Sequence, residues 1–420
     1  MFYDIKTKLS SKIFSDIQSH VYFLIQLLIV GLGFFSLLIT TNFLDVESRG
    51  QLVTISTCIG LLVLLFDAGN GFSLSKSYAK YKLQRREIIT IAYALAFSKT
   101  ILLFVLVIFA ENFFSGFLQN LGFSLQYIWI AFLISTNILF FGLISPTILI
   151  EKNLISYGLS LLIFSGAGFL GLLFVAIFFQ VSLSKLFYAQ FVCEFFALFL
   201  AIFSVRSIFT RPTKIRKNLA LKILKDGFLI YISSLANFAN SKAVLLLIAY
   251  LFNSTTVAVF SVVFVLVDKI WLFGDAIGTK LFRTQASKKT FQTEHLIKGL
   301  KLNGAVVIFV NLILYFSLPT ILNLLFPEEY SDVSSYILPM MLWSLFCSSW
   351  RIIWLGLNAY NSAISAKINI FGATFNVFAM YVALTIFELK IGLYALSLSS
   401  IICCTFGIKQ IFFFKKELRI

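Results

Sequence analysis

Residues 21–44 read VYFLIQLLIVGLGFFSLLITTNFL, an apolar stretch without a charged side chain. A helix needs about 20 apolar residues to cross the hydrocarbon core of a bilayer. The hydrophobic region of a secretory signal peptide is shorter and precedes a cleavage site of small residues, which this stretch lacks. We therefore interpret residues 21–44 as a retained first transmembrane helix.

Comparable apolar runs follow along the whole chain. Of its 420 residues, 60% are hydrophobic and 12% are charged, whereas a soluble domain has about 25% charged residues. Most of the surface must therefore face lipid. Because the runs are continuous, unlike the ~10-residue alternating segments of a membrane barrel, the sequence predicts an all-α polytopic membrane protein. About twelve transmembrane helices are expected, at residues 20–42, 52–74, 88–110, 126–150, 155–180, 186–207, 227–252, 256–279, 300–326, 333–357, 366–388 and 391–413.

The distribution of basic residues predicts which side of the membrane each loop faces. Lys and Arg collect on cytoplasmic loops. With a cytoplasmic N-terminus, the outer loops hold only Arg49, Lys185 and Lys390, and the outer segment 326–332 is acidic. The net charge of +16 is then explained without a nucleic acid partner, and both termini are expected to be cytoplasmic. The basic inner segments are 6–12, 76–86, 152, 206–225, 280–301, 367 and 415–419.

The longest basic connection, residues 206–226, lies at the midpoint of the chain. Shifting the sequence so that Asp67 falls on Asp275 also brings the loop 42–50 onto residues 250–258. Because an even number of helices returns the chain to the same side, the halves are expected to be parallel repeats with a cavity between them. The expected parts are an N-terminal six-helix lobe at residues 1–209, a cytoplasmic basic linker at 210–226 and a C-terminal six-helix lobe at 227–420.

No pattern in the sequence predicts an enzyme. The nucleotide-binding loop G-x-x-x-x-G-K-[ST] does not occur, and no outer loop carries the charged cluster that glycan chemistry would need. His20 stands at the start of the first predicted helix and His295 lies in a basic loop, and the two have no metal-ligand spacing. The glycines of 166–171 and 274–278 fall within apolar runs, so we interpret them as close helix contacts. We expect a transporter without catalytic residues, metal or cofactor.

Four basic residues fall well inside the predicted helices, away from the helix ends, namely Lys99, Lys242, Lys269 and Arg351. A charge at a helix centre costs about 2.5–3.5 kcal/mol on insertion scales, so such residues usually face a wet cavity or a partner. Together they predict a basic lumen that binds an anionic group such as phosphate or pyrophosphate. The alternative for Lys99 and Lys242 is a side chain that reaches from the helix to the lipid headgroups.

Four acids also fall within the predicted helices, away from the terminal residues, namely Asp67, Glu194, Asp268 and Asp275. They are candidates for binding a coupling ion or for structural pairing. Asp67 and Asp275 approach the cytoplasmic ends of their helices, which favours a structural role. Adjacent Asp268 and Lys269 point about 100° apart on a helix, so they are not expected to pair with each other.

Several short motifs together resemble those of a known family. In chain order they are SRGQL at 48–52, DAGNG at 67–71, NSK at 240–242 and LFPEEY at 325–330. In order and spacing they resemble polysaccharide flippases, the O-antigen (Wzx-type) translocases of the multidrug/oligosaccharidyl-lipid/polysaccharide (MOP) exporter superfamily. The resemblance extends over nearly the whole chain, although the glycine that is usual in the second-half loop is Ala258 here.

The resemblance implies a MATE/MOP-like fold whose two lobes give alternating access to a cationic cavity in the bacterial inner membrane. The implied substrate is an undecaprenyl-pyrophosphate-linked oligosaccharide, an O-antigen or capsule repeat unit, flipped from the cytoplasmic to the outer leaflet. Lys242 stands where this family often has a cavity-facing basic residue. The implied partners are the lipid-linked oligosaccharide, membrane lipids, a glycan polymerase and a chain-length regulator. Coupling to an H⁺ or Na⁺ gradient or to the membrane potential stays open.

The main alternative is a multidrug or organic-cation antiporter of the same superfamily. Such an exporter is expected to carry carboxylates in its lumen, and residues 21–44 have none. A lipid II flippase is disfavoured because those relatives have two extra helices. A membrane-integral glycan polymerase or ligase would need a large charged outer loop, which the sequence lacks.

Overall fold

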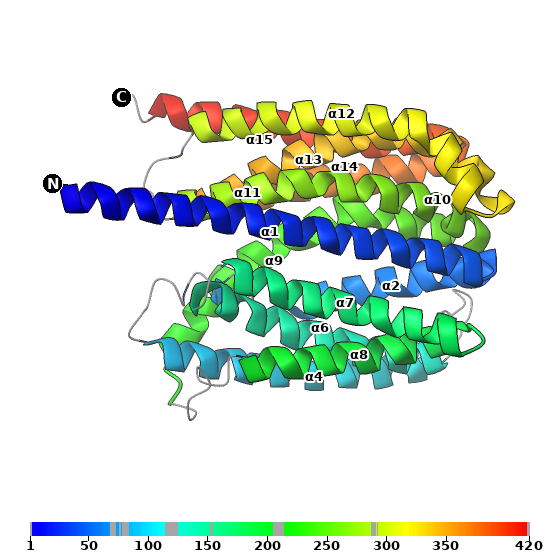
Figure 1. Cartoon of the computed structure of the whole chain (residues 1–420), viewed down its shortest axis with the longest axis horizontal. Coiled ribbons are helices and arrows are strands. Elements are labelled where there is room, and N and C mark those ends of the chain that lie inside the picture. The colour runs from blue at the N-terminus through cyan, green and yellow to red at the C-terminus, as the bar shows by residue number, and fades with distance from the viewer. Residues whose placement is uncertain are drawn as a thin grey trace.

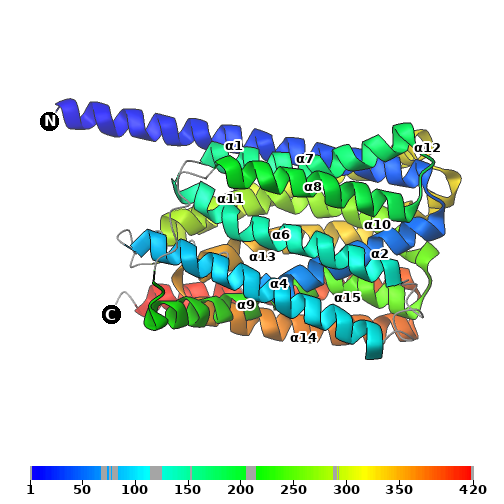
Figure 2. The ribbon, with the colours of Figure 1, turned by 90° about the horizontal axis from the view of Figure 1, so that it is seen from below.

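The computed structural model describes residues 2–67, 73–74, 77, 84–113, 125–151, 154–204, 214–286, 291 and 293–417. This part of the chain is almost entirely helical, and twelve of its helical segments are long and apolar enough to cross a membrane. The predicted fold class is therefore confirmed. The helices run roughly parallel to one another, and both termini lie at the same end of the bundle (Figures 1 and 2). We call the opposite end the far end.

The first half of the chain contributes α1 (Phe2–Phe43), α2 (Val46–Asp67), α4 (Arg85–Phe113), α6 (Leu125–Glu151), α7 (Leu154–Phe178) and α8 (Leu183–Ser204). The second half contributes α9 (Lys217–Leu251), α10 (Ser254–Asp268), the 3₁₀ turn η2 (Lys269–Trp271), α11 (Leu272–Ala286), α12 (Thr293–Leu325), η3 (Glu328–Tyr336), α13 (Ile337–Tyr360), α14 (Ser362–Ile386) and α15 (Leu389–Glu417). Figure 1 shows the second-half helices α10 to α15 above α1 and the other first-half helices below it.

We use first lobe and second lobe for the helices of the first and second half of the chain. The second lobe contributes most of one large apolar cluster, which Leu37 of α1 also joins. Phe264 of α10 stacks on Trp343 of α13 with ring centroids 5.5 Å apart, and both side chains are buried. Gly274 lets α11 pack closely against α13, because a Cβ at Gly274 would lie 2.4 Å from the Ser348 carbonyl oxygen. Gly171 has the same role in the first lobe, where a Cβ would lie 2.8 Å from the backbone of Ala189. Both glycine motifs are thus close helix contacts, as predicted.

Helix α2 begins earlier than predicted, at Val46 instead of residue 52. Asp45 caps its first turn, because the Ser48 backbone N–H donates to the Asp45 carboxylate at 2.9 Å. This hydrogen bond holds the pKa of the Asp45 carboxyl below its usual range. Arg49, predicted in an outer loop, consequently lies on the first turns of α2, where its side chain is buried.

Helix α9 also begins earlier than predicted, and it includes residues 217–226 of the predicted linker. Leu219 and Ile223 form an apolar stripe on its first turns and pack in the cluster of Leu74 and Ile88 from the first half. The Ser73 hydroxyl donates to the Ile223 carbonyl at 2.6 Å. The first turns of α9 are therefore attached to the first lobe, whereas later turns pack against α14 of the second.

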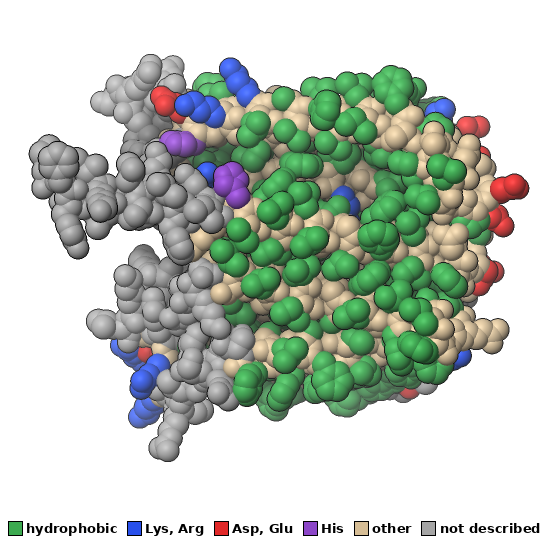
Figure 3. All heavy atoms as spheres, viewed as in Figure 1, with side chains coloured by type: hydrophobic (Ala, Val, Ile, Leu, Met, Phe, Trp, Pro, Cys, Tyr) green, Lys and Arg blue, Asp and Glu red, His purple; other side chains and the backbone are tan. Residues whose placement is uncertain are grey.

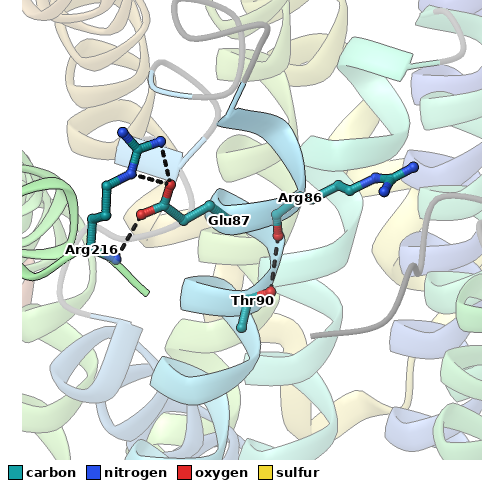
Figure 4. A network of polar contacts seen from close by, with 4 residues as sticks. All are labelled: Arg86, Glu87, Thr90 and Arg216. Carbon is teal, nitrogen blue, oxygen red and sulfur yellow. Dashed lines mark hydrogen bonds and ion pairs between the residues drawn. The ribbon is translucent and has the colours of Figure 1, made fainter. Parts of the chain in front are cut away.

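The residue before α9 is tied to α4 by an ion pair. Glu87 accepts the Arg216 backbone N–H at 2.7 Å and its Nε–H at 2.9 Å (Figure 4). One turn along, the Thr90 hydroxyl donates to the Arg86 carbonyl. Because the Arg216 side chain is 64% exposed, this pair orients the start of α9 but adds little stability.

The surface is that of a membrane protein. Hydrophobic side chains cover the middle of the face seen in Figure 3, and acidic side chains gather at the far end. Large apolar side chains such as Phe196, Phe316 and Leu324 are more than half exposed, as expected where lipid replaces water. The protein is a multi-pass membrane protein.

Candidate transport pathway

Lys269 lies at a break in the middle of a membrane-spanning segment. Helix α10 ends at Asp268, a 3₁₀ turn covers Lys269–Trp271, and α11 begins at Leu272. Short 3₁₀ stretches inside longer helices often mark functional hinges. The break begins with Lys269 and directly follows Asp268, two ionisable residues predicted to lie inside this helix.

The Lys269 side chain lines a cavity of about 210 Å³. The cavity lies between α1, which contributes Phe23, Gln26 and Val30, and the second lobe, which contributes Lys269 and Val310. The Lys269 side chain lies against α1 at Gly33, because a Cβ at Gly33 would be 3.4 Å from Lys269 Cε. Among the described residues, no hydrogen bond or ion pair to its ammonium is found. A basic group thus sits in a largely apolar cavity between the lobes.

Lys242 lies on the side of α9 that faces the first lobe. The ring of Phe238, one turn earlier, would be 3.7 Å from a Cβ at Gly60 of α2. Residues one turn apart share a helix face, so Lys242 points toward the same interface. It is half-buried, and within the described part of the chain it has no hydrogen-bond or ion-pair partner.

Arg351 is paired with an acid inside the second lobe. Its Nε–H donates to the Asp275 carboxylate, and its guanidinium lies 5.2 Å from the Trp271 ring centroid and 4.4 Å from that of Trp354. The two charged side chains are 20% and 30% exposed. One predicted substrate-binding cation and one predicted acid therefore neutralise each other, and the guanidinium also lies near two indole rings.

Asp275 faces aromatic side chains of the first lobe. Tyr22 of α1 and Tyr157 of α7 stack at 6.2 Å, and the carboxylate is near enough to interact electrostatically with both hydroxyls. Phe23 contacts Phe273 of α11 at 5.8 Å between ring centroids. The Asp275–Arg351 pair thus borders the interface between the lobes at the end nearer the termini.

Lys99 is bonded to α2. Its ammonium donates to the backbone carbonyl of Asp67, the last described residue of that helix. The Lys99 side chain is buried. This bond joins α4 to α2 within the first half of the chain.

Two of the predicted acids are buried without a charged partner among the described residues. Glu194 accepts a hydrogen bond from the Gln190 amide at 2.8 Å and lies over Gly168, while its second carboxylate oxygen has no partner there. Asp268 is also buried, with one carboxylate oxygen unbonded, near the Cys347 thiol. A buried ionised carboxylate is costly without compensation, which distinguishes these two acids from Asp275, whose carboxylate is paired with Arg351.

The structure does not gather the four predicted cations into one cluster. Lys99 is bonded to the end of α2 and Arg351 to Asp275, whereas Lys242 and Lys269 lie separately at the interface between the lobes. In the described part of the chain, no group of three or more His, Cys, Asp or Glu is placed to hold a metal ion.

Sequence reasoning missed the most buried cation at the interface, Arg49. Its guanidinium donates to the Ala258 carbonyl at 2.5 Å and to the Ser261 hydroxyl at 2.7 Å, both on α10. It also lies 5.5 Å from the Tyr330 ring centroid. The available signal was the predicted repeat offset, which places Gly50 on Ala258, because equivalent turns of two parallel repeats would meet at their shared axis.

A known protein family and several solved structures resemble this chain. A sequence profile described as "Polysaccharide biosynthesis protein" matches residues 18–273. The chain belongs to this family. The resemblance predicted from the sequence motifs is therefore confirmed. No curated protein sequence matches this polysaccharide biosynthesis protein.

Solved structures share its fold. The inward-facing form of a multidrug resistance MATE family transporter of the MOP superfamily aligns with 14% identity and a TM-score of 0.68, over 95% of this chain and 99% of the transporter. The outward-facing form gives 14% identity and 0.69, over 95% and 96%. The lipid II flippase MurJ in an inward closed conformation gives 16% identity and 0.69, over 93% and 87%.

The family and the fold together identify a polysaccharide biosynthesis transporter of the MOP type, not an enzyme. Because inward-facing and outward-facing relatives superpose equally well, the state of the lobes has to be described from this chain's own contacts.

Proposed function

We propose that this protein flips an undecaprenyl-pyrophosphate-linked oligosaccharide, an O-antigen or capsule repeat unit, from the cytoplasmic to the outer leaflet of the bacterial inner membrane. Both termini are cytoplasmic in this proposal, and the far end faces outward. The observation that carries it is Lys269, a basic side chain without a described partner in the cavity between α1 and the α10–α11 break of a polysaccharide biosynthesis protein.

An anionic headgroup would compensate the charge of this cavity. An ammonium in apolar surroundings loses hydration, and a phosphate at close range replaces the lost interaction. Lys242 and Lys269 have no described partner and are assigned to the pyrophosphate. Arg351, held by Asp275, borders the pathway and orients the headgroup, while Lys99 and Asp67 stabilise the end of α2.

The remaining substrate needs more room than the cavity offers. A volume of about 210 Å³ suits a small anionic group but not an oligosaccharide. The lobes therefore have to separate for the glycan to pass, while the prenyl chain stays in lipid along the apolar outer surface. Glu194 and Asp268, buried without charged partners among the described residues, are the candidates for coupling this motion to an H⁺ or Na⁺ gradient.

The test is flipping in reconstituted vesicles. A fluorescent polyprenyl-pyrophosphate-linked oligosaccharide is placed in both leaflets, and its transfer is followed with a membrane-impermeant quencher. Lys269→Ala is expected to slow flipping about tenfold or more, the size of one lost bond to a charged group. Lys301→Ala, which removes an exposed lysine of α12, is the matched control and should leave the rate unchanged. Equal rates for both folded variants would contradict the assignment of Lys269.

A further inference from the structure

We propose that Arg49 is the outer lock of the transport cycle, a residue of the first lobe that holds the second lobe closed at the far end and is released once per cycle. This inference rests on the two-lobed transport cycle proposed above. It goes beyond that cycle by assigning the closed state to particular bonds.

All described partners of the Arg49 side chain belong to the other lobe. Its NH1 group donates to the Ala258 carbonyl and the Ser261 hydroxyl of α10, and its guanidinium lies against Tyr330 of η3. The Ser261 hydroxyl also donates to the Ala258 carbonyl at 2.7 Å, which fixes both acceptors. With 2% of its surface exposed, Arg49 is enclosed by the second lobe although α2 carries it.

The lobes approach closely at the same place. A Cβ at Gly50 would lie 1.9 Å from the Ser254 carbonyl oxygen, so the backbones of α2 and α10 are in direct contact there. The Asn42 amide adds a bond to the Leu325 carbonyl at 3.0 Å, but this contact is exposed. Any outward opening has to separate α2 from α10, and it therefore has to break the bonds of Arg49.

The chemistry of the contact makes it reversible. The acceptors are neutral, and the Nε atom of Arg49 has no partner among the described residues. A buried arginine without a carboxylate gives up much of its hydration. Opening returns the Arg49 guanidinium to water, and its hydration offsets part of the free energy lost with the hydrogen bonds. The closed state is thus favoured by a modest margin, as an equilibrium that reverses in each cycle requires.

The anchor of the lock is rigid. Asp45 caps the first turn of α2 through the Ser48 N–H, so Arg49 is presented from an ordered helix end instead of a loop. A purely structural role for Arg49 would predict lower stability of the fold with unchanged lobe positions. A lock predicts the opposite, namely intact lobes with a shifted equilibrium between closed and outward-open forms.

The experiment measures the distance between the lobes without substrate. Spin labels on unnatural residues replacing Lys185 of α8 and Lys390 of α15, both exposed at the far end, report it by double electron–electron resonance. Arg49→Ala is expected to raise the ratio of outward-open to closed protein about 10- to 100-fold, as expected for the loss of a bond to a charged group. Arg86→Ala, which removes an exposed arginine near the other end, is the control and should change nothing.

Ser261→Ala keeps the test decisive if Arg49→Ala fails to fold. It removes one acceptor from the other lobe and should shift the distances in the same direction by less. Adding Ser261→Ala to Arg49→Ala should produce no further shift, because the two residues act through one bond. Unchanged distances in a folded Arg49→Ala or Ser261→Ala protein would overturn the lock. Since no substrate is present, the result is independent of which molecule is flipped.

Discussion

Two arginines at the interface between the lobes occupy opposite environments. Arg49 at the far end is 2% exposed and donates to neutral acceptors of the other lobe. Arg351, nearer the termini, is 20% exposed, is paired with Asp275 of its own lobe and faces the first lobe through that acid. Arg49 therefore joins the two lobes at the far end, whereas Arg351 is neutralised within its own lobe at the end nearer the termini.

This difference indicates where the pathway is closed. At the far end, direct backbone contact and buried bonds leave no room between α2 and α10. Nearer the termini, aromatic rings and a part-exposed ion pair line the interface, and a cavity with a basic side chain lies beside α1. The contacts therefore describe a protein that is closed at the far end, with Lys269, a cation without a described partner that we propose as an anion site, deeper in the bundle.

The largest effect is expected from filling the close contact at the far end. Gly50→Leu places side-chain atoms where the Ser254 carbonyl lies, so the lobes cannot close there and flipping should be abolished in folded protein. Gly31→Leu is the control, because nothing lies within 4 Å of a Cβ at Gly31. Vesicle flipping assays compare the two. Wild-type flipping by Gly50→Leu would contradict the closed contact.

Breaking the ion pair nearer the termini is expected to have the next largest effect. Arg351→Leu leaves the Asp275 carboxylate without its partner, and the free energy of unfolding should fall by about 1–3 kcal/mol for a pair that is neither exposed nor fully buried. Arg351→Leu combined with Asp275→Leu should restore most of that loss. Thermal unfolding of purified protein measures both. A double variant as unstable as the single one would show that the pair is not the cause.

A variant of Lys99 distinguishes a structural role for this cation from a role in substrate binding. Lys99→Met removes the bond to the Asp67 carbonyl of α2 and should lower the free energy of unfolding by about 1–2 kcal/mol. Flipping, measured at a temperature where the variant is folded, should stay near the wild-type rate, in contrast to Lys269→Ala. Slow flipping with unchanged stability would return Lys99 to the substrate site.

The smallest effect is expected from removing the N-cap of α2, the helix that carries Arg49. Asp45→Ala removes the N-cap of α2 and should cost about 1 kcal/mol. Because the pKa of Asp45 is lowered in the folded protein, its contribution is fully present above its ordinary value and is lost as the pH falls through the folded value. Stability of the wild type between pH 6 and pH 3 should therefore fall more than that of Asp45→Ala. Parallel acid titrations would disprove the cap.

The spans were predictable because hydropathy is a local property of the chain. The twelve apolar runs and the close contacts of Gly171 and Gly274 follow from residues within one helix length. The start of α9 was missed because its many charges concealed an apolar stripe at Leu219 and Ile223. The role of Leu219 and Ile223 became clear only from the surface of the first lobe against which they pack.

The pairing of charges was less predictable. Arg351 and Asp275 were recognised as intramembrane ionisable residues, but their contact depends on the rotation of α13 against α11. Arg49 was assigned to a loop because α2 was started at residue 52, and its burial depends on how the lobes meet. Distances between helices far apart in sequence decide such roles, and one sequence does not contain them.

The most direct test of the central claim is made in the native strain. The gene is deleted, and lipid-linked oligosaccharides are extracted from the membrane and assigned to a leaflet. The proposed function predicts that an undecaprenyl-linked repeat unit accumulates in the cytoplasmic leaflet and that surface polysaccharide is lost. Unchanged glycolipids together with raised sensitivity to cationic drugs would contradict the flippase and support an antiporter of the same superfamily.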